Sequence, residues 1–194
     1  MPFSYMNDLY TIDPARVSHN QTSYDRTGGN ADGTGFLYSD ATGKVMLDAA
    51  GPGVVRSIWV TGFGPEDRLK VYFDGEAEPR IDALVVDLFS GNCADYGNQF
   101  PVPLVGGNKA YSGGFVCYVP LPFAKSIKIS TTIANMSYNQ FRYDTYPEGT
   151  PITSWTPEQD NSAMARAWSN VTADPEDGEG IAVAADTVDL RAGE

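Results

Sequence analysis

Short runs of β-branched and aromatic residues, separated by glycine, proline and aspartate, predict strands along most of the chain. The clearest run is residues 54–63, whose mix of Val, Ile and Trp indicates burial near the centre of a sheet. Residues 68–73 instead alternate apolar side chains with charged or phenolic ones, which is the period of a half-exposed strand. The pattern therefore predicts a fold built on sheets that are buried on one face.

Further strands repeat this pattern. Residues 36–39 and 44–48 flank a turn at 40–43, which predicts a hairpin, and Asp74-Gly75 predicts a second turn. Later strands are expected at residues 114–120, 126–133 and 137–146. Roughly eight strands with irregular connections favour an all-β fold, and we expect a jelly-roll β-sandwich.

One short helix is expected near the C-terminal end, at residues 156–169. Thr156 suits the N-cap and Pro157 the first helical position, because an N-cap hydroxyl accepts a free backbone N–H and proline needs none. The apolar side of this helix would consist of Met164, Ala167 and Trp168.

The expected organisation has four parts. An extended N-terminal arm occupies residues 1–22 and the jelly-roll domain residues 23–155, followed by the helix at 156–169. Residues 170–194 are acidic and poor in aromatic side chains, which predicts a linker or tail to which a further domain would attach.

The composition disfavours several classes of function. The 194 residues carry a formal net charge of −12, which disfavours binding to nucleic acid and to anionic membranes and is compatible with a neutral substrate such as a carbohydrate. A single histidine, His19, argues against a histidine-based triad, and we expect it to face solvent in a loop. Cys93 and Cys117 either pair or remain free, without metal-binding spacing, so no metal and no cofactor is expected. No signal peptide is visible, which leaves the localisation open.

The most unusual stretch is residues 23–33, which places Asp25, Arg26, Asn30 and Asp32 among three glycines. Such a loop can direct several polar side chains into a small volume, and a carboxylate beside a guanidinium suits the binding of sugar hydroxyls or a carboxylate. Two alternatives stay open at this point: an ordered turn that these side chains hold closed, and a calcium site around residues 30–33. A second candidate is the long loop at residues 90–112, which either has a function or covers a sheet edge.

Several separate motifs, in order, resemble the N-terminal half of glycoside hydrolase family 172. The resemblance spans about residues 3–155, and the segments that carry it are 23–32, Gly51-Pro52-Gly53-Val54-Val55-Arg56-Ser57-Ile58-Trp59, Val71-Tyr72-Phe73-Asp74-Gly75-Glu76, Gly113-Gly114-Phe115-Val116-Cys117-Tyr118, 120–125 and Thr145-Tyr146-Pro147-Glu148-Gly149-Thr150.

This resemblance implies a jelly roll followed by a second jelly roll, assembly as trimers or hexamers, and retaining exo-hydrolysis of α-D-fructofuranosides or α-D-arabinofuranosides. Two catalytic glutamates would lie in the second half of the family sequence, which matches no segment of this chain. Retaining hydrolysis requires two carboxyl groups ~5 Å apart. We therefore assign no catalytic residue to this chain.

On this interpretation Asp25, Arg26, Asn30 and Asp32 would bind furanose hydroxyls, and Trp59 would either stack on a sugar or lie in the core. The partners would be an oligosaccharide or glycoside, further copies of the chain and a second jelly roll. The alternative is a non-catalytic module for carbohydrate binding or capsid-like assembly, because jelly rolls serve these functions as well as enzymes.

Overall fold

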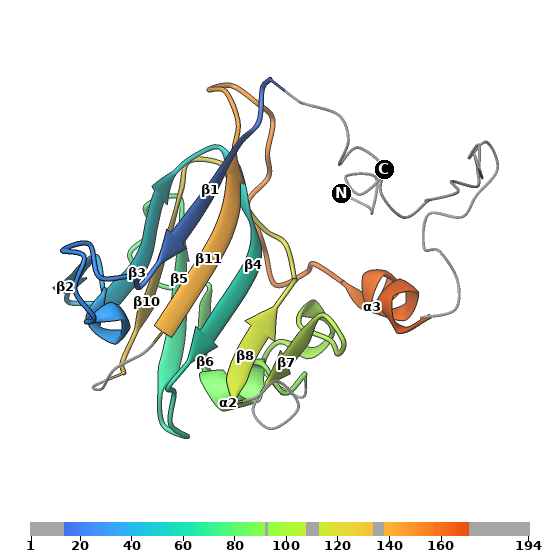
Figure 1. Ribbon diagram of the computed structural model, residues 1–194. Helices are drawn as coiled ribbons and strands as arrows, with labels where there is room; N and C mark the ends of the chain where they lie inside the picture. Colours follow the sequence, from blue (N-terminus) through green and yellow to red (C-terminus); the bar gives the residue numbers. More distant parts are fainter. Residues whose placement is uncertain (1–13, 92, 108–112, 134–137, 171–194) are drawn as a thin grey trace, which may run out of the picture.

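A computed structural model describes residues 14–91, 93–107, 113–133 and 138–170 of the chain. Two antiparallel sheets pack face to face (Figure 1). Sheet A contains, in spatial order, β1 (Val17–Thr22), β11 (Tyr138–Thr145), β4 (Gly53–Thr61), β8 (Gly114–Cys117) and β7 (Val105–Gly107), and β9 (Leu121–Phe123) also pairs with β4. Sheet B contains β2 (Tyr38–Asp40), β3 (Gly43–Ala50), β10 (Ser126–Thr131), β5 (Arg68–Phe73) and β6 (Ile81–Leu84).

The strand pairing is nested along the chain. β1 pairs with β11, β3 with β10, β4 with β8 and β9, and β5 with β6, all antiparallel. Pairing from the outermost strands inward, with the pairs distributed over two sheets, is the jelly-roll arrangement. The predicted jelly-roll β-sandwich is confirmed.

The core lies between the sheets and follows the period of two expected for strands. On β5, Leu69, Val71 and Phe73 are buried in it, while Arg68 and Lys70 are half-exposed on the outer face. Tyr72, also on the outer face, is nevertheless buried, and the Lys128 ammonium lies 4.9 Å from the centre of its ring. The alternation in residues 68–73 therefore predicts the orientation of this strand correctly.

The C-terminal helix is shorter than expected. Helix α3 (Ser162–Ser169) begins six residues after Thr156, so the predicted N-cap at Thr156 and helical start at Pro157 are wrong. Asp160 accepts the backbone N–H of Ser162, and the Asn161 amide donates to the Gln99 carbonyl 2.6 Å away. These contacts fix the chain in a turn before the helix, so tertiary structure overrides the local capping signal.

Other short elements divide segments that the sequence pattern left continuous. The apolar run after β6 becomes helix α2 (Val85–Leu88), and the long loop at 90–112 contains the 3₁₀ turn η2 (Gly97–Gln99) as well as β7. A further 3₁₀ turn, η1 (Asp32–Thr34), begins within the end of the loop at 23–33. Strand β1 falls within the predicted arm, whereas residues 1–13 and 171–194 of the arm and tail lie outside the described residues. No described helix is long and apolar enough to cross a membrane.

Asp74 connects three parts of the fold. It begins the turn after β5 with φ of 56°, followed by Gly75 with φ of 80°, and the Glu76 N–H donates to the Phe73 carbonyl at 2.9 Å, as in a tight turn with two left-handed central residues. Its carboxylate accepts the Lys125 N–H at 2.7 Å, the Ser126 N–H at 3.3 Å and the Ser154 hydroxyl. Burial alone would raise the pKa of Asp74, but these hydrogen bonds and the nearby Arg80 outweigh it and lower the pKa below 3.8.

We expect Asp74→Asn to lower the free energy of unfolding by about 1–2 kcal/mol at pH 7, since asparagine tolerates positive φ but removes the charge that accepts these bonds. A lowered folded-state pKa contributes stability above the unfolded pKa and loses it as the pH falls through the folded pKa. The difference between wild type and variant should therefore shrink below pH 3.8. Urea unfolding at pH 7 and at several acidic pH values measures it, with Asp87→Asn at an exposed site as the control.

Candidate functional site

The loop at residues 23–33 follows β1 and is organised around Asp25. One carboxylate oxygen of Asp25 accepts the Thr27 N–H at 2.9 Å and the Thr27 hydroxyl at 2.7 Å, and the other accepts the Ala31 N–H at 3.1 Å. A Cβ on Gly29 would lie 2.6 Å from this second oxygen, so any other residue there would require the Asp25 carboxylate to shift. The hydrogen bonds from Thr27, chiefly from its hydroxyl, lower the pKa of Asp25 and keep the group ionised.

Asp32 closes the same loop from its other end. Its carboxylate accepts the Asp25 N–H at 2.7 Å, at the start of the 3₁₀ turn η1. The two acids of the loop thus bind backbone N–H groups within it. This geometry agrees with an ordered turn, which was one of the interpretations left open by the sequence. Among the described residues no group of three or more His, Cys, Asp or Glu side chains is arranged to hold a metal ion.

Arg26 and Asn30 present their polar groups to solvent. The Arg26 guanidinium donates to the carbonyls of Thr22 at 3.2 Å and Tyr24 at 3.4 Å, and it lies 4.6 Å from the centre of the exposed Tyr24 ring. Asn30 is exposed. The structure therefore divides the four predicted residues into two acids that stabilise the loop and two side chains that are available for contacts.

Trp59 lies on the outer face of sheet A, with 38% of its surface exposed. Its neighbours along β4, Ile58 and Val60, are buried in the core, and strand alternation points the indole the opposite way. The alternative that Trp59 belongs to the core is therefore wrong. In register it lies beside Gln140 of β11, which in turn pairs with Thr22 at the end of β1. The backbones of Trp59 and Thr22 are thus two strand spacings, ~10 Å, apart.

The outer face of β11 carries further polar and aromatic side chains that sequence reasoning did not single out. Tyr138, Gln140 and Arg142 occupy alternate positions on this face, while Asn139 and Phe141 between them are buried. The alternation of aromatic and polar residues in this strand was visible in the sequence. The sequence did not show which of the two alternating sets of side chains faces outward, because this depends on the strands with which β11 pairs.

The outer face of sheet B is different in character. Asp48 of β3, Lys128 of β10 and Tyr72 of β5 lie in one row across it, and Lys128 also pairs with Asp40 at 3.1 Å. On the same face, Arg68 of β5 pairs with Asp82 of β6 at 2.6 Å. Opposite charges that are already paired are typical of a solvated face. Sheet A, with exposed Trp59, Tyr138 and Arg142, is the more suitable face for a ligand.

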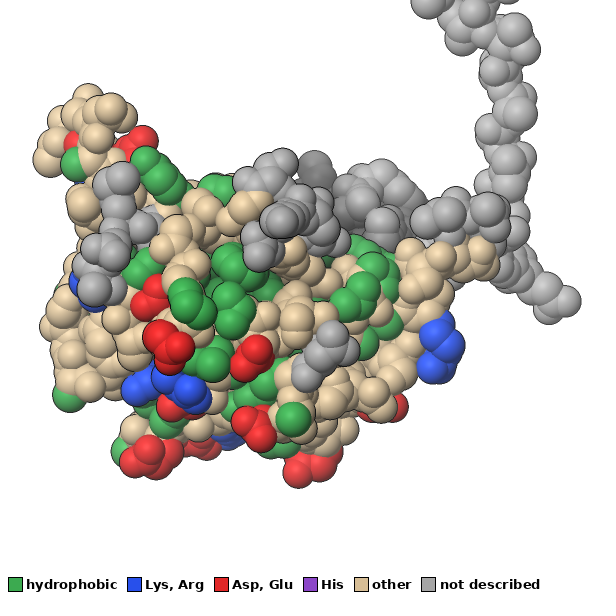
Figure 2. All heavy atoms as spheres, turned by 90° about the horizontal axis from the view of Figure 1, so that it is seen from below, with side chains coloured by type: hydrophobic (Ala, Val, Ile, Leu, Met, Phe, Trp, Pro, Cys, Tyr) green, Lys and Arg blue, Asp and Glu red, His purple; other side chains and the backbone are tan. Residues whose placement is uncertain are grey.

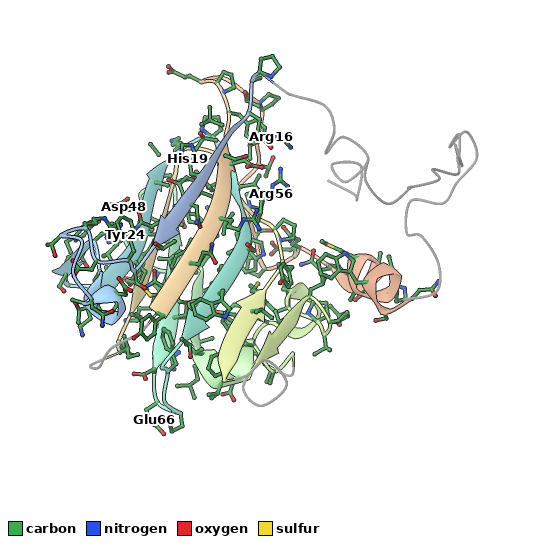
Figure 3. The ribbon with its side chains drawn as sticks, viewed as in Figure 1. Arg16, His19, Tyr24, Asp48, Arg56 and Glu66 are labelled. Carbon is green, nitrogen blue, oxygen red and sulfur yellow. The ribbon has the colours of Figure 1, made fainter. Side chains whose placement is uncertain are left out.

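One end of the sandwich shows the acidic character of the protein. Figure 2 shows the end below the view of Figure 1, where acidic side chains are spread among apolar ones. The described residues form no broad basic surface on this end. In Figure 3, Tyr24 lies in the loop after β1, and Arg56 lies beside β4.

The long loop contributes anchors to the fold. The Tyr96 hydroxyl accepts the Asp82 N–H at 2.8 Å, and the Gln99 amide donates to the Pro157 carbonyl. Both contacts tie the loop to its neighbours, β6 and the segment before α3. This part of the structure agrees with a loop that covers the sandwich.

The remaining candidates for chemistry also have structural environments. The prediction that His19 lies in a loop is wrong, because its backbone pairs with Tyr143 as part of β1. Its ring stacks on Tyr143 at 4.7 Å, and its Nε2 is 2.8 Å from the Thr145 hydroxyl. Cys93 and Cys117 are free and buried, and burial raises the pKa of the Cys117 thiol to about 12. The glutamates of the described chain are all exposed: Glu66, Glu76, Glu78, Glu148 and Glu158.

Comparison with known proteins adds the family. No curated protein sequence matches the chain. The family model of the GH172 first beta-sandwich domain matches residues 14–163, which covers the sandwich from β1 to the start of α3. The chain therefore belongs to glycoside hydrolase family 172, as its first β-sandwich domain.

Proposed function

We propose that this chain is the substrate-binding half of a retaining exo-glycoside hydrolase acting on α-D-fructofuranosides or α-D-arabinofuranosides. Membership of family 172 supports a function related to glycoside hydrolysis. The observation that carries the proposal is the exposed Trp59, in register with the strand end that leads into the loop of Arg26 and Asn30. An indole offers an apolar surface for a sugar ring, and the guanidinium and amide offer donors for its hydroxyls.

The catalytic acids would come from outside this chain. Retaining hydrolysis requires two carboxyl groups ~5 Å apart, and Glu76 in the described chain is already paired with Arg80. We propose that a second jelly roll supplies both glutamates, and that assembly into a trimer or hexamer brings them to the loop and Trp59. The sandwich then forms one wall of the site and part of the subunit contacts.

Release of free sugar tests this function directly. The purified protein, with and without any chain that copurifies with it, is incubated with aryl α-D-arabinofuranoside and aryl α-D-fructofuranoside. Turnover of either substrate with retention of configuration supports the proposal. If the complete assembly turns over neither, the non-catalytic carbohydrate-binding or assembly module becomes the better interpretation.

Arg26→Ala is expected to reduce kcat/KM for the preferred furanoside roughly 10- to 150-fold, the equivalent of about 1.5–3 kcal/mol for a charge-assisted hydrogen bond. Arg26→Lys keeps the charge without the planar fork and should recover part of this loss. Arg166→Ala, on the exposed side of α3, serves as the control. Wild-type kinetics in Arg26→Ala, with the thermal unfolding midpoint unchanged, would count against the role of Arg26.

A further inference from the structure

The outer face of β11 continues the row of ligand-type side chains away from the loop. Gln140 lies beside Trp59, and Arg142 follows two residues later on the same face, ~7 Å further along the strand. Arg142 is flanked in register by Asn20 of β1 and by Ser57 of β4. Amide, guanidinium and hydroxyl groups thus come from three adjacent strands to one stretch of the sheet.

Arg142 differs from three other arginines that lie in or next to the strands. Arg56, Arg68 and Arg80 each form an ion pair with a carboxylate. Arg142 is exposed and, within the described part of the chain, has no ion-pair partner, although acidic residues outnumber basic ones by 25 to 13. Its guanidinium therefore keeps its five N–H donors available for a ligand.

The row has defined ends. Two residues beyond Arg142, the Asp144 carboxylate is occupied by the Arg56 guanidinium at 2.9 Å and the Ser18 hydroxyl at 2.7 Å. In the other direction the row reaches Trp59 and Thr22, where the loop at 23–33 begins. The available donors therefore extend from the loop to Arg142, which is longer than one sugar ring requires.

We propose that Gln140, Arg142, Asn20 and Ser57 bind the sugar units of a polymeric glycan that extend beyond the unit held at Trp59 and the loop. This inference rests on the proposed function and names its substrate class: a neutral, hydroxyl-rich chain rather than a small glycoside. The donors suit hydroxyl oxygens, and the exposed Trp59 and Tyr138 provide apolar surface for sugar rings. The net charge of −12 opposes a polyanionic chain.

The test compares two substrates in the assembled protein: an aryl α-D-arabinofuranoside with a single sugar, and a soluble linear polymer of α-D-arabinofuranosyl units. Arg142→Ala is expected to raise KM for the polymer more than KM for the aryl furanoside. The ratio of the variant's KM to the wild-type KM should be about tenfold larger for the polymer than for the aryl furanoside. Lys70→Ala, on the outer face of sheet B, should change neither value and serves as the matched control. An equal effect of Arg142→Ala on both substrates, or no effect on the polymer, would overturn the inference.

Two further measurements separate the alternatives. If the wild type turns over neither substrate, the proposed function fails, but affinity electrophoresis in polymer-containing gels still tests the inference. The polymer should retard the wild type more than it retards Arg142→Ala. Equal migration of the two proteins would overturn the inference. Light scattering after size exclusion reports on assembly. A change of oligomeric state in Arg142→Ala would assign this face to a second copy of the chain and overturn the glycan assignment.

Discussion

Replacing Trp155 with alanine is expected to lower the free energy of unfolding by about 3–5 kcal/mol, the usual cost of removing a large aromatic side chain from a core. Trp155 is 1% exposed, and its ring lies 5.9 Å from Phe73, 6.0 Å from Phe100 and 6.4 Å from Tyr96. These rings come from β5 and from the long loop, so the tryptophan connects the segment after β11 to both. Its loss would leave a cavity that spans all three parts.

Denaturant unfolding measures this prediction, and the chain offers a matched control. Trp59→Ala removes the same side chain from an exposed position and should cost about 1 kcal/mol or less. Trp155→Phe keeps an aromatic ring in the core and should fall between wild type and Trp155→Ala, which provides a folded comparison if the alanine variant is too unstable. Equal losses for Trp155→Ala and Trp59→Ala would contradict the packing described above.

The fold could be predicted because its strands carry their own signals. Residues 54–63 are rich in β-branched side chains and form β4 (Gly53–Thr61), and the Asp74-Gly75 pair forms the expected turn. The start of α3 could not be predicted, because it depends on Asn161 and the distant Gln99. Local capping signals near Thr156 are real, but a contact 62 residues away in sequence decides the boundary.

The orientation of Trp59 was hidden by an irregularity in the sheet. The register between β4 and β11 shifts between Arg142 and Tyr143, because Arg56 of β4 is skipped, so the period of two is interrupted in the first half of β4. Val54, Val55 and Ile58 are all buried, which makes the strand look apolar on both faces. The burial of Ile58 and Val60 on either side, which only the structure gives, shows that Trp59 points outward.

The sequence showed that the loop at 23–33 is unusual, but not which of its polar side chains bind within the loop and which face solvent. Gly29 leaves room for Asp25 to accept hydrogen bonds from Thr27 and Ala31, and this use of the carboxylate depends on three-dimensional closure. A sequence shows that an acid, a base and an amide are adjacent, and both a binding loop and a self-closed turn need such groups. For this reason Arg26 and Asn30, rather than Asp25 and Asp32, are the first positions to test for substrate contacts.

Arg56→Ala is expected to lower the free energy of unfolding by about 2–4 kcal/mol, because it leaves a largely buried carboxylate without its cation. The Arg56 Nε lies 2.9 Å from Asp144, and the side chains of the pair are only 18% and 11% exposed. Arg56 also donates to the Tyr146 hydroxyl at 2.8 Å, so the variant removes a second hydrogen bond from the same network. Asp144 would retain the Ser18 hydroxyl as a donor.

The matched comparison is Arg68→Ala, which breaks an ion pair of similar geometry in a more exposed position. Arg68 and Asp82 lie 2.6 Å apart with side chains 38% and 36% exposed, and we expect a loss of about 1 kcal/mol or less. Adding Asp144→Ala to Arg56→Ala should recover part of the stability, since it removes the unpaired charge, and the double-mutant cycle gives the coupling between the two groups. Equal losses for the two arginine variants, or no recovery in the double variant, would show that burial of the Arg56–Asp144 pair does not determine its contribution.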